Sequence, residues 1–162
     1  MQLLKKMCEI HAPSGEEFEM TKFLLQFIKE NQKHWKTIPE IHSGEGFQDN
    51  IILAFGNNPR TAIFAHLDSI GFTVKYNNEI VKIGGPATDE GILLVGKDSI
   101  GKIEGKIIKK NGRLYLDFSR EVERGTSLTF KVNFRENNDF VQTCYLDNRL
   151  GVWNALEQAK TI

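Results

Sequence analysis

The hydrophobic period of this chain changes twice, and this change limits the folds that it can adopt. Residues 71–145 form a series of short strand-like runs, such as GRLYLDF, joined by turns rich in glycine and asparagine, and no stretch among them has helical spacing. Repeated short strands of this kind are typical of a small β-barrel or β-sandwich. Helical spacing precedes this block and returns after it, so the sequence predicts an all-β domain inserted into an α/β domain.

Two helices are predicted near the amino terminus. The first ends at the breaker sequence HAPSG, and Ser14 with Glu17 then has the spacing of a capping box, in which each side chain binds the other's backbone amide. A second helix is therefore predicted to start at Ser14. Its apolar side chains recur at the spacing of a core-facing stripe: Met20, Phe23, Leu24, Phe27 and Ile28.

Two continuous apolar runs follow these helices and predict strands. The runs NIILAFG and TAIFAH are separated by the turn NNPR and read as strands buried on both faces. The predicted domains are then residues 1–70 as the first segment of the α/β domain, 71–143 as the inserted β domain and 144–162 as a helical return. A sheet with so few strands has little core, so we expect this chain to be part of a longer one.

Composition and charge exclude several classes of function. Lys plus Arg and Asp plus Glu number 21 each among 162 residues, so no net charge attracts nucleic acid or an anionic membrane. No apolar run approaches the roughly 18 residues that a membrane-spanning helix needs. Cys8 and Cys144 are far apart without metal-type spacing, which is typical of reduced, buried cysteines. We therefore expect a cytoplasmic protein that binds neither nucleic acid nor membrane.

The run AIFAHLDSIGF places two polar side chains at the end of a predicted strand. His66 and Asp68 are two positions apart, so in a strand both point to the same face, and the carboxyl ends of strands are where open α/β sheets bind ligands. A neutral imidazole is a common metal ligand, and a nearby carboxylate can accept its other ring N–H. The spacing therefore suits a metal site, and the alternative is a histidine that simply has its hydrogen bonds satisfied.

The run YLDNRLG holds the second candidate group. Asp147 follows a strand-like run and precedes the last predicted helix, so Asp147 or Asn148 can be its N-cap regardless of function. Arg149 in the first turn is slightly unfavourable with the helix dipole, which hints at an anionic neighbour; the alternative is a surface charge. A carboxylate can also bridge two divalent ions that activate water for hydrolysis, and His66 with Asp147 would be part of such an arrangement.

The two motifs together resemble a known family. AHLDSIGF, followed after a β-rich insertion by YLDNRLGVWNALEQA, is similar to the glutamyl or tetrahedral aminopeptidases, a di-zinc family whose members are sometimes labelled endoglucanases. HAPSGEE and GFQDNIILAFG resemble its amino-terminal segment, so the likeness covers essentially the whole chain. It implies the amino-terminal half of a zinc-exopeptidase-type mixed sheet with helices, interrupted by a barrel-like domain, with the carboxyl-terminal half of the catalytic domain absent.

The resemblance also implies roles for single residues. His66 would be a ligand of one metal ion, Asp147 the carboxylate that bridges both, and Asp68 the catalytic residue behind His66. Asn148 would form a cis peptide with Asp147, and Arg149 would help to hold the turn. The implied cofactors are two divalent ions, zinc first, although cobalt and manganese suit the same ligands.

This chain departs from the family pattern in two respects. Many relatives have Asp-Asp where this chain has Asp147-Asn148, which changes a charge beside the bridging carboxylate. The family's Glu-Glu pair, with the general base, and its later Asp and His ligands follow the second motif and are not in this chain. His11, His34 and His42 have no partner spacing, so we interpret all three as surface or turn residues.

The sequence therefore predicts a metal-dependent aminopeptidase that removes the amino-terminal residue of a peptide, and we expect a homo-oligomer built through the β domain. These residues alone should be inactive, since the base is missing. A second hypothesis is a related zinc exopeptidase or deacylase, against which the long separation of the two motifs argues. A third is a binding module, a β-barrel with helical flanks and no metal.

Overall fold

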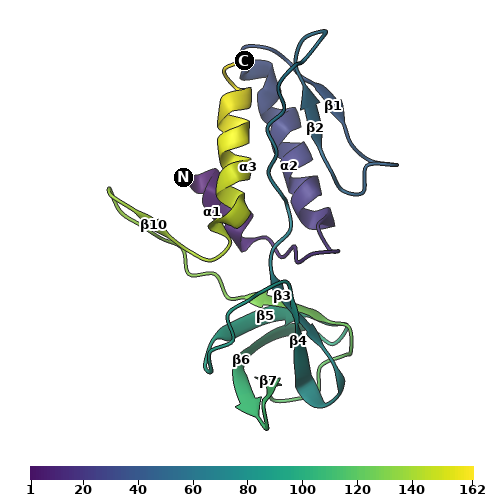
Figure 1. Ribbon diagram of the computed structural model, residues 1–162, viewed down its shortest axis with the longest axis vertical. Coiled ribbons are helices and arrows are strands. Elements are labelled where there is room, and N and C mark those ends of the chain that lie inside the picture. The colour runs from purple at the N-terminus through teal and green to yellow at the C-terminus, as the bar shows by residue number, and fades with distance from the viewer. The chain divides into compact units, whose positions relative to one another are not determined.

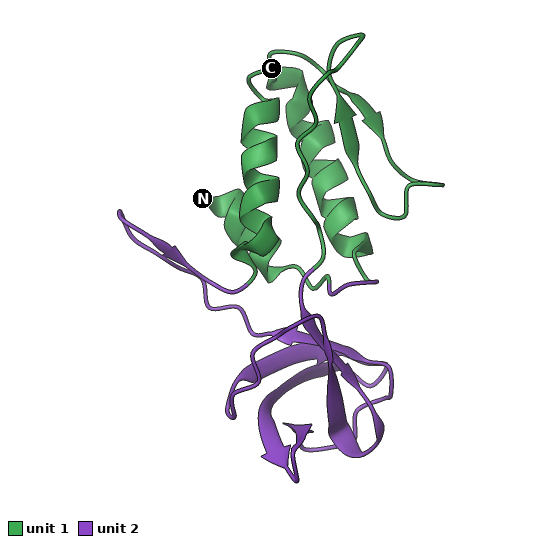
Figure 2. Cartoon of the chain, viewed as in Figure 1, with its two compact units in different colours: residues 1–12, 16–68, 145–162 green, residues 13–15, 69–144 purple.

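The structure is a computed structural model that describes all of residues 1–162, and Figure 1 follows the chain from end to end. The chain divides into two compact units (Figure 2). Unit 1 comprises Met1–Ala12, Glu16–Asp68 and Tyr145–Ile162, and unit 2 comprises Pro13–Gly15 and Ser69–Cys144. The architecture is mixed α/β with one closed β-barrel. No helix combines the length and apolar character needed to cross a membrane.

Unit 1 is built mainly from helices, which bury the apolar stripes seen in the sequence. Helix α1 packs against α3, and α2 is followed by the short helix η1. Leu4 and Met7 of α1 and Met20 of α2 are fully buried. The bounds of these elements are α1 Gln2–Glu9, α2 Phe18–Asn31, η1 Gln32–His34 and α3 Leu146–Ala159.

The predicted start of the second helix is wrong. Helix α2 begins at Phe18, with Glu17 as its N-cap residue and no side-chain cap bond. Ser14 instead donates its backbone N–H to the carbonyl of Ser69 at 3.2 Å, next to a parallel bridge between Pro13 and Ser69. Gly15 then has a φ of 92°, a left-handed conformation that glycine tolerates and that interrupts a helix. The backbone bond to Ser69 thus overrides the local capping pattern.

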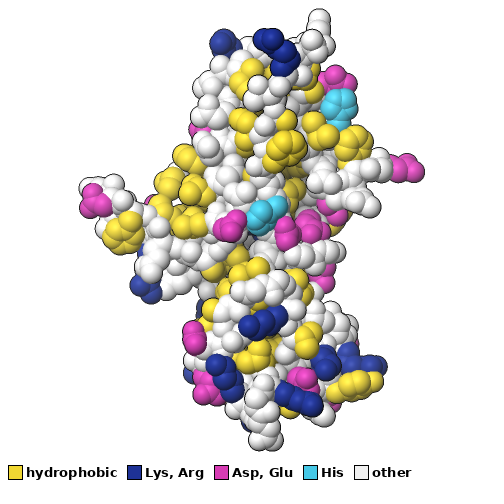
Figure 3. Space-filling model, viewed as in Figure 1, with side chains coloured by type: hydrophobic (Ala, Val, Ile, Leu, Met, Phe, Trp, Pro, Cys, Tyr) yellow, Lys and Arg dark blue, Asp and Glu magenta, His cyan; other side chains and the backbone are white.

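The two predicted buried strands are also only partly correct. The first run contains β2 (Ile52–Ala54), which pairs antiparallel with β1 (Glu40–His42), but Ile52 is half exposed. The second run, TAIFAH, forms no strand, and its Phe64 side chain is 88% exposed. Strands buried on both faces need a neighbour on each side, and no strand lies beside this segment. Figure 3 shows apolar side chains at the surface of the molecule. The exposed large apolar residues of unit 1 include Ile38, Ile52, Ile63 and Phe64.

Unit 2 contains the predicted barrel. Its strands close in the order β3-β4-β7-β6-β5-β8, and all of the pairings are antiparallel. Inward-facing apolar side chains alternate with polar ones along β6, which gives one buried core that includes Phe72, Leu94 and Ile107. The bounds are β3 Gly71–Val74, η2 Tyr76–Asn78, β4 Glu79–Ile83, β5 Leu93–Lys97, β6 Lys102–Lys110, β7 Arg113–Asp117 and β8 Ser127–Phe130.

The last two strands of the β block do not join the barrel. Strands β9 (Arg135–Glu136) and β10 (Val141–Gln142) form a separate antiparallel hairpin. Strand β8 therefore ends at Phe130, and the next strand begins only at Arg135. Phe140 lies in the hairpin turn and is half exposed.

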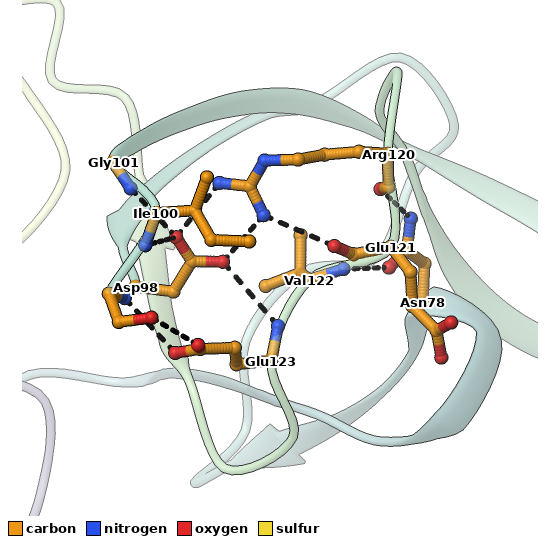
Figure 4. A network of polar contacts seen from close by, with 9 residues as sticks. Asn78, Asp98, Ile100, Gly101, Arg120, Glu121, Val122 and Glu123 are labelled. Atoms are coloured by element: carbon orange, nitrogen blue, oxygen red, sulfur yellow. Dashed lines mark hydrogen bonds and ion pairs between the residues drawn. The ribbon is translucent and has the colours of Figure 1, made fainter.

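A polar network joins three loops of the barrel (Figure 4). The two terminal guanidinium nitrogens of Arg120 donate to the Asp98 carboxylate, at 2.6 and 2.8 Å, and the backbone amides of Ile100 and Gly101 donate to the same carboxylate. Glu123 accepts from Ser99 at the edge of this network. The hydrogen bonds from Arg120 hold the pKa of Asp98 well below its usual range.

Candidate functional site

The structure brings together the two polar motifs predicted to meet. In unit 1, His66 Nε2 lies 3.0 Å from Asp147 Oδ1, although 81 positions separate the two residues. On the other side of the ring, His66 Nδ1 lies 3.0 Å from Asp68 Oδ1. The imidazole is thus held between two carboxylates, and the histidine has its hydrogen bonds satisfied by groups that could also bind a metal.

Asp147 reaches His66 because the chain turns sharply before α3. Tyr145 has a φ of 70°, and Asp147 and Asn148 have non-helical angles, so the regular part of the helix starts after them. The peptide bond between Asp147 and Asn148 is cis, as the family resemblance implied. Tyr145 is the N-cap residue of α3 as a whole, and it makes no side-chain cap hydrogen bond. The Asp147 side chain is 95% exposed and free to accept a ligand beside His66.

Arg149 lies beneath this turn and is not a surface charge. Only 1% of the residue is exposed, and its Nε and both terminal nitrogens lack a hydrogen-bond partner. Burial lowers the pKa of Arg149, while Cys8, Asp68 and Tyr145 oppose that shift electrostatically. Its backbone N–H donates to the Tyr145 carbonyl at 3.2 Å, which fixes its place in the turn.

Gly151 is a residue of this site that the sequence did not single out. A Cβ atom at Gly151 would lie 1.9 Å from Asn148 Oδ1, so the Asn148 amide occupies the space that a side chain would need. The available signal was a single glycine inside a helical pattern, which is costly unless packing requires it. Gly151 therefore makes room for the residue that follows Asp147.

The other histidines lie away from the pair. His34 is an exposed residue of η1, as predicted for a surface position. His11 and His42 do have carboxylate neighbours, Glu16 at 3.7 Å and Glu40 at 3.4 Å, which the sequence spacing did not indicate. Neither contact includes His66, Asp68 or Asp147.

A groove between the helices of unit 1 is separate from these residues. It has a volume of about 750 Å³ and is lined by α1, α2 and α3, with Phe23, Phe27 and Trp153 among its apolar walls. Lys6 and Glu30 also line it, whereas His66, Asp68 and Asp147 do not. The candidate site is therefore a surface cluster rather than a residue set inside this groove.

The His66 cluster, formed by His66, Asp68 and Asp147, has a geometry that suits part of a divalent-cation site. Two donors bound to one zinc ion at about 2.0–2.1 Å lie roughly 3.3 Å apart at the tetrahedral angle, close to the 3.0 Å between His66 Nε2 and Asp147 Oδ1. Asp68 on Nδ1 matches the carboxylate that commonly orients a metal-bound imidazole. The structure has no group of three or more His, Cys, Asp or Glu side chains placed to hold an ion. The chain thus offers two adjacent donors but no complete ligand set.

Comparison with known proteins gives a fold likeness. Neither a protein-family model nor a curated protein matches this chain. Among solved structures, the TET1 peptidase of Pyrococcus horikoshii matches with a TM-score of 0.77 and 22% identity, over 98% of this chain and 55% of that one. A TET aminopeptidase from a marine sediment Thaumarchaeota archaeon matches with a TM-score of 0.80 and 17% identity, over 99% and 52%.

A third solved structure also matches this chain. An endoglucanase from Thermotoga maritima matches with a TM-score of 0.70 and 21% identity, over 96% of this chain and 54% of that one. At these identities the likeness is one of fold. The chain spans about half the length of the solved structures it matches, and nearly all of it has the fold of part of a TET-type peptidase.

Proposed function

We propose that this chain is the metal-ligand-bearing first part of a metal-dependent aminopeptidase, which removes the amino-terminal residue from peptides. One observation carries the proposal: His66 Nε2 and Asp147 Oδ1 are 3.0 Å apart, with Asp68 at the other ring nitrogen, although the groups come from distant parts of the sequence. The fold likeness to TET peptidases supports a peptidase, and the sequence resemblance supplies the aminopeptidase.

The residues of this chain would act by holding and orienting. His66 would bind one divalent ion through Nε2, and Asp147 would bridge two ions with its exposed carboxylate. Asp68 orients the imidazole through Nδ1, so that Nε2 faces Asp147. Bound divalent ions of this kind activate a water molecule and stabilise the oxyanion in amide hydrolysis. The general base and further ligands would come from outside residues 1–162, in the carboxyl-terminal half of the catalytic domain.

Metal binding tests this proposal directly. We expect the whole chain to retain zinc in equilibrium dialysis, and His66→Ala and Asp147→Asn each to weaken binding at least tenfold. His34→Ala is the matched control, because it removes an exposed histidine outside the cluster and should bind like the unsubstituted chain. Equal zinc binding by His66→Ala and His34→Ala would contradict the metal site. No metal retained by any variant would favour the binding-module hypothesis.

Activity separates the two enzyme hypotheses. A polypeptide that joins this chain to the missing half is expected to cleave an unblocked aminoacyl-nitroanilide and not its acylated form; the reverse preference would favour a deacylase. Residues 1–162 alone are expected to be inactive, and zinc-dependent cleavage by them would contradict the assignment of the base to another segment.

We also propose that the protein forms a homo-oligomer through its β domain. The Pyrococcus horikoshii TET1 peptidase can assemble into a tetrahedron or a large octahedral shell. Light scattering of the longer polypeptide, with and without residues 71–143, would test this, and a monomer in both cases would argue against it. The expected cytoplasmic location also stays a prediction, and neither Cys8 nor Cys144 forms a disulfide.

A further inference from the structure

Residues 61–65, the run TAIFA, form an apolar segment of unit 1 whose side chains are not covered. Ile63 is 63% exposed, and the adjacent Phe64 is 88% exposed. Figure 1 shows the segment, in teal, within a long stretch of chain that belongs to no helix or strand. Neighbouring side chains of a drawn-out backbone point to opposite sides, so exposure of both residues means that both faces of the segment are open.

The backbone of the segment is unpaired as well. No N–H or C=O group of residues 61–65 takes part in a backbone hydrogen bond. The strands of unit 1, β1 and β2, pair only with each other. Residues 61–65 thus resemble a sheet strand that lacks its neighbours on both edges and its covering layer on both faces.

The composition of the segment is that of an interior strand. Three of its five side chains are β-branched or aromatic, the types that are enriched in strands. Natural proteins protect edge strands with charged residues, proline or bulges, but residues 61–65 contain no charged residue and no proline. Such a strand is protected from aggregation when both of its edges are paired.

A continuation of the polypeptide fits these open edges better than a second copy of the chain does. A second copy that pairs about a two-fold axis closes one edge and leaves the other open, and repeated pairing along both edges gives an open-ended filament. The solved structures that match this chain are about twice as long, so a polypeptide of their length has enough further residues for several strands. Ile162 lies in the same compact unit as the segment, so polypeptide that follows it starts in unit 1.

We propose that residues 61–65 become an interior β-strand by pairing along both edges with polypeptide that follows Ile162, which also covers Ile63 and Phe64. The strand ends directly before His66, so the pairing fixes the backbone that carries this candidate metal ligand. The inference rests on the proposed function only in requiring a longer protein. It requires neither a metal ion nor catalysis.

Hydrogen exchange followed by mass spectrometry tests the pairing. Residues 1–162 are compared with the longer polypeptide that joins them to the missing half. In residues 1–162 we expect the amides of 61–65 to exchange as fast as those of an unfolded peptide, because they have no hydrogen bond. In the longer polypeptide we expect exchange at least 100-fold slower. Strand β5 is paired on both sides in the barrel, so it is the control and should be protected in both proteins.

Three results of this comparison would overturn the proposal. Fast exchange of residues 61–65 in the longer polypeptide, with β5 protected, would show that no strand pairs with them. Protection in residues 1–162 that rises with protein concentration would identify a second copy as the partner. Protection at every concentration would show that the segment is already paired within the chain.

Substitution of Ile63 gives a second measurement, which stays informative when a variant does not fold. Ile63→Glu is compared with Ile100→Glu, which places the same charge on an isoleucine of similar exposure, 68%, in the turn after β5. In residues 1–162 both variants should keep the urea midpoint of the unsubstituted chain, since both side chains are exposed. In the longer polypeptide only Ile63→Glu should lower the midpoint or abolish folding, because it buries an unpaired charge.

The outcomes also separate this inference from the proposed function. A lower midpoint for Ile63→Glu in residues 1–162, or equal midpoints of the two variants in the longer polypeptide, would overturn the strand. Protection of residues 61–65 in a polypeptide that retains no zinc would refute the metal site and support the strand. Zinc retention with residues 61–65 unprotected would support the metal site and overturn the strand.

Discussion

Substitution of Gly151 by alanine should separate the stability of helix α3 from the geometry of the site. Alanine in a helix is favoured over glycine by up to about 1 kcal/mol, the value for a helix interior, and Gly151 lies in the first regular turn of α3. The new Cβ would lie 1.9 Å from Asn148 Oδ1, so the amide must retreat by about 1.5 Å to reach ordinary contact at 3.4 Å. A side-chain end can do this by leaving its rotamer, at about 0.5–1.5 kcal/mol. The two effects nearly cancel, and we expect the free energy of unfolding to change by less than about 1 kcal/mol.

The same substitution should still disturb the turn that carries Asp147. We expect Gly151→Ala to weaken zinc binding about tenfold, measured by competition with a chromophoric chelator, while urea unfolding of the metal-free chain is almost unchanged. Gly85→Ala is the matched control, because no heavy atom lies within 4 Å of its added Cβ; it should gain about 0.4–1 kcal/mol of stability and bind zinc normally. Unaltered zinc affinity in Gly151→Ala would refute the idea that the position of the Asn148 side chain affects metal binding. A loss of more than about 2 kcal/mol in the free energy of unfolding would refute the calculation.

Three further predictions concern the barrel. Gly96→Ala should cost about 1–3 kcal/mol in urea unfolding, because its Cβ would lie 2.6 Å from the backbone oxygen of Ser127, which cannot rotate away; no loss would contradict this close approach. Leu128→Ala should cost about 2–5 kcal/mol, since Leu128 is fully buried in the barrel core; a loss below about 1 kcal/mol would show a core that collapses around the cavity. Hydrogen bonds from Arg120 lower the pKa of Asp98, so its contribution to stability is present above the unfolded-state value near 3.9 and is lost as the pH falls below it. Asp98→Asn should therefore unfold with a weaker dependence on pH in acid, and an identical acid dependence of the two urea midpoints would contradict this.

The helices and the barrel could be predicted because their signals are local. The stripe that includes Leu24 and Ile28 recurs at the helical period, and both residues are buried in α2. Strand runs with glycine turns indicated the barrel in the same way. The run TAIFAH was misjudged because burial on both faces depends on neighbouring strands, which no property of the run itself can reveal. Its exposed Phe64 shows how far an apolar run alone can mislead.

The site was predictable only in part, for a related reason. The contact between His66 and Asp147 followed from combining two motifs and from a family resemblance, while the residues alone left a satisfied histidine and a helix cap as open alternatives. The burial of Arg149 and the space at Gly151 are properties of the tertiary structure. A dipole argument hinted at an anionic neighbour for Arg149, but it could not say that the guanidinium would be fully buried.

The contact between His66 and Asp147 follows from the fold. It does not by itself hold together the two ends of the segment that separates these residues in the sequence. The chain leaves unit 1 after Asp68 and returns at Tyr145, and the pair spans 81 positions. Closing a flexible loop of that length costs about 4 kcal/mol of chain entropy, apart from a constant term. An exposed ion pair contributes about 0–1 kcal/mol, and the Asp147 side chain is 95% exposed. The packing of α1 against α3 and the folding of the inserted barrel must therefore supply the closure. A cation bound by both groups would add its binding energy to a pair that the fold has already brought within 3.0 Å.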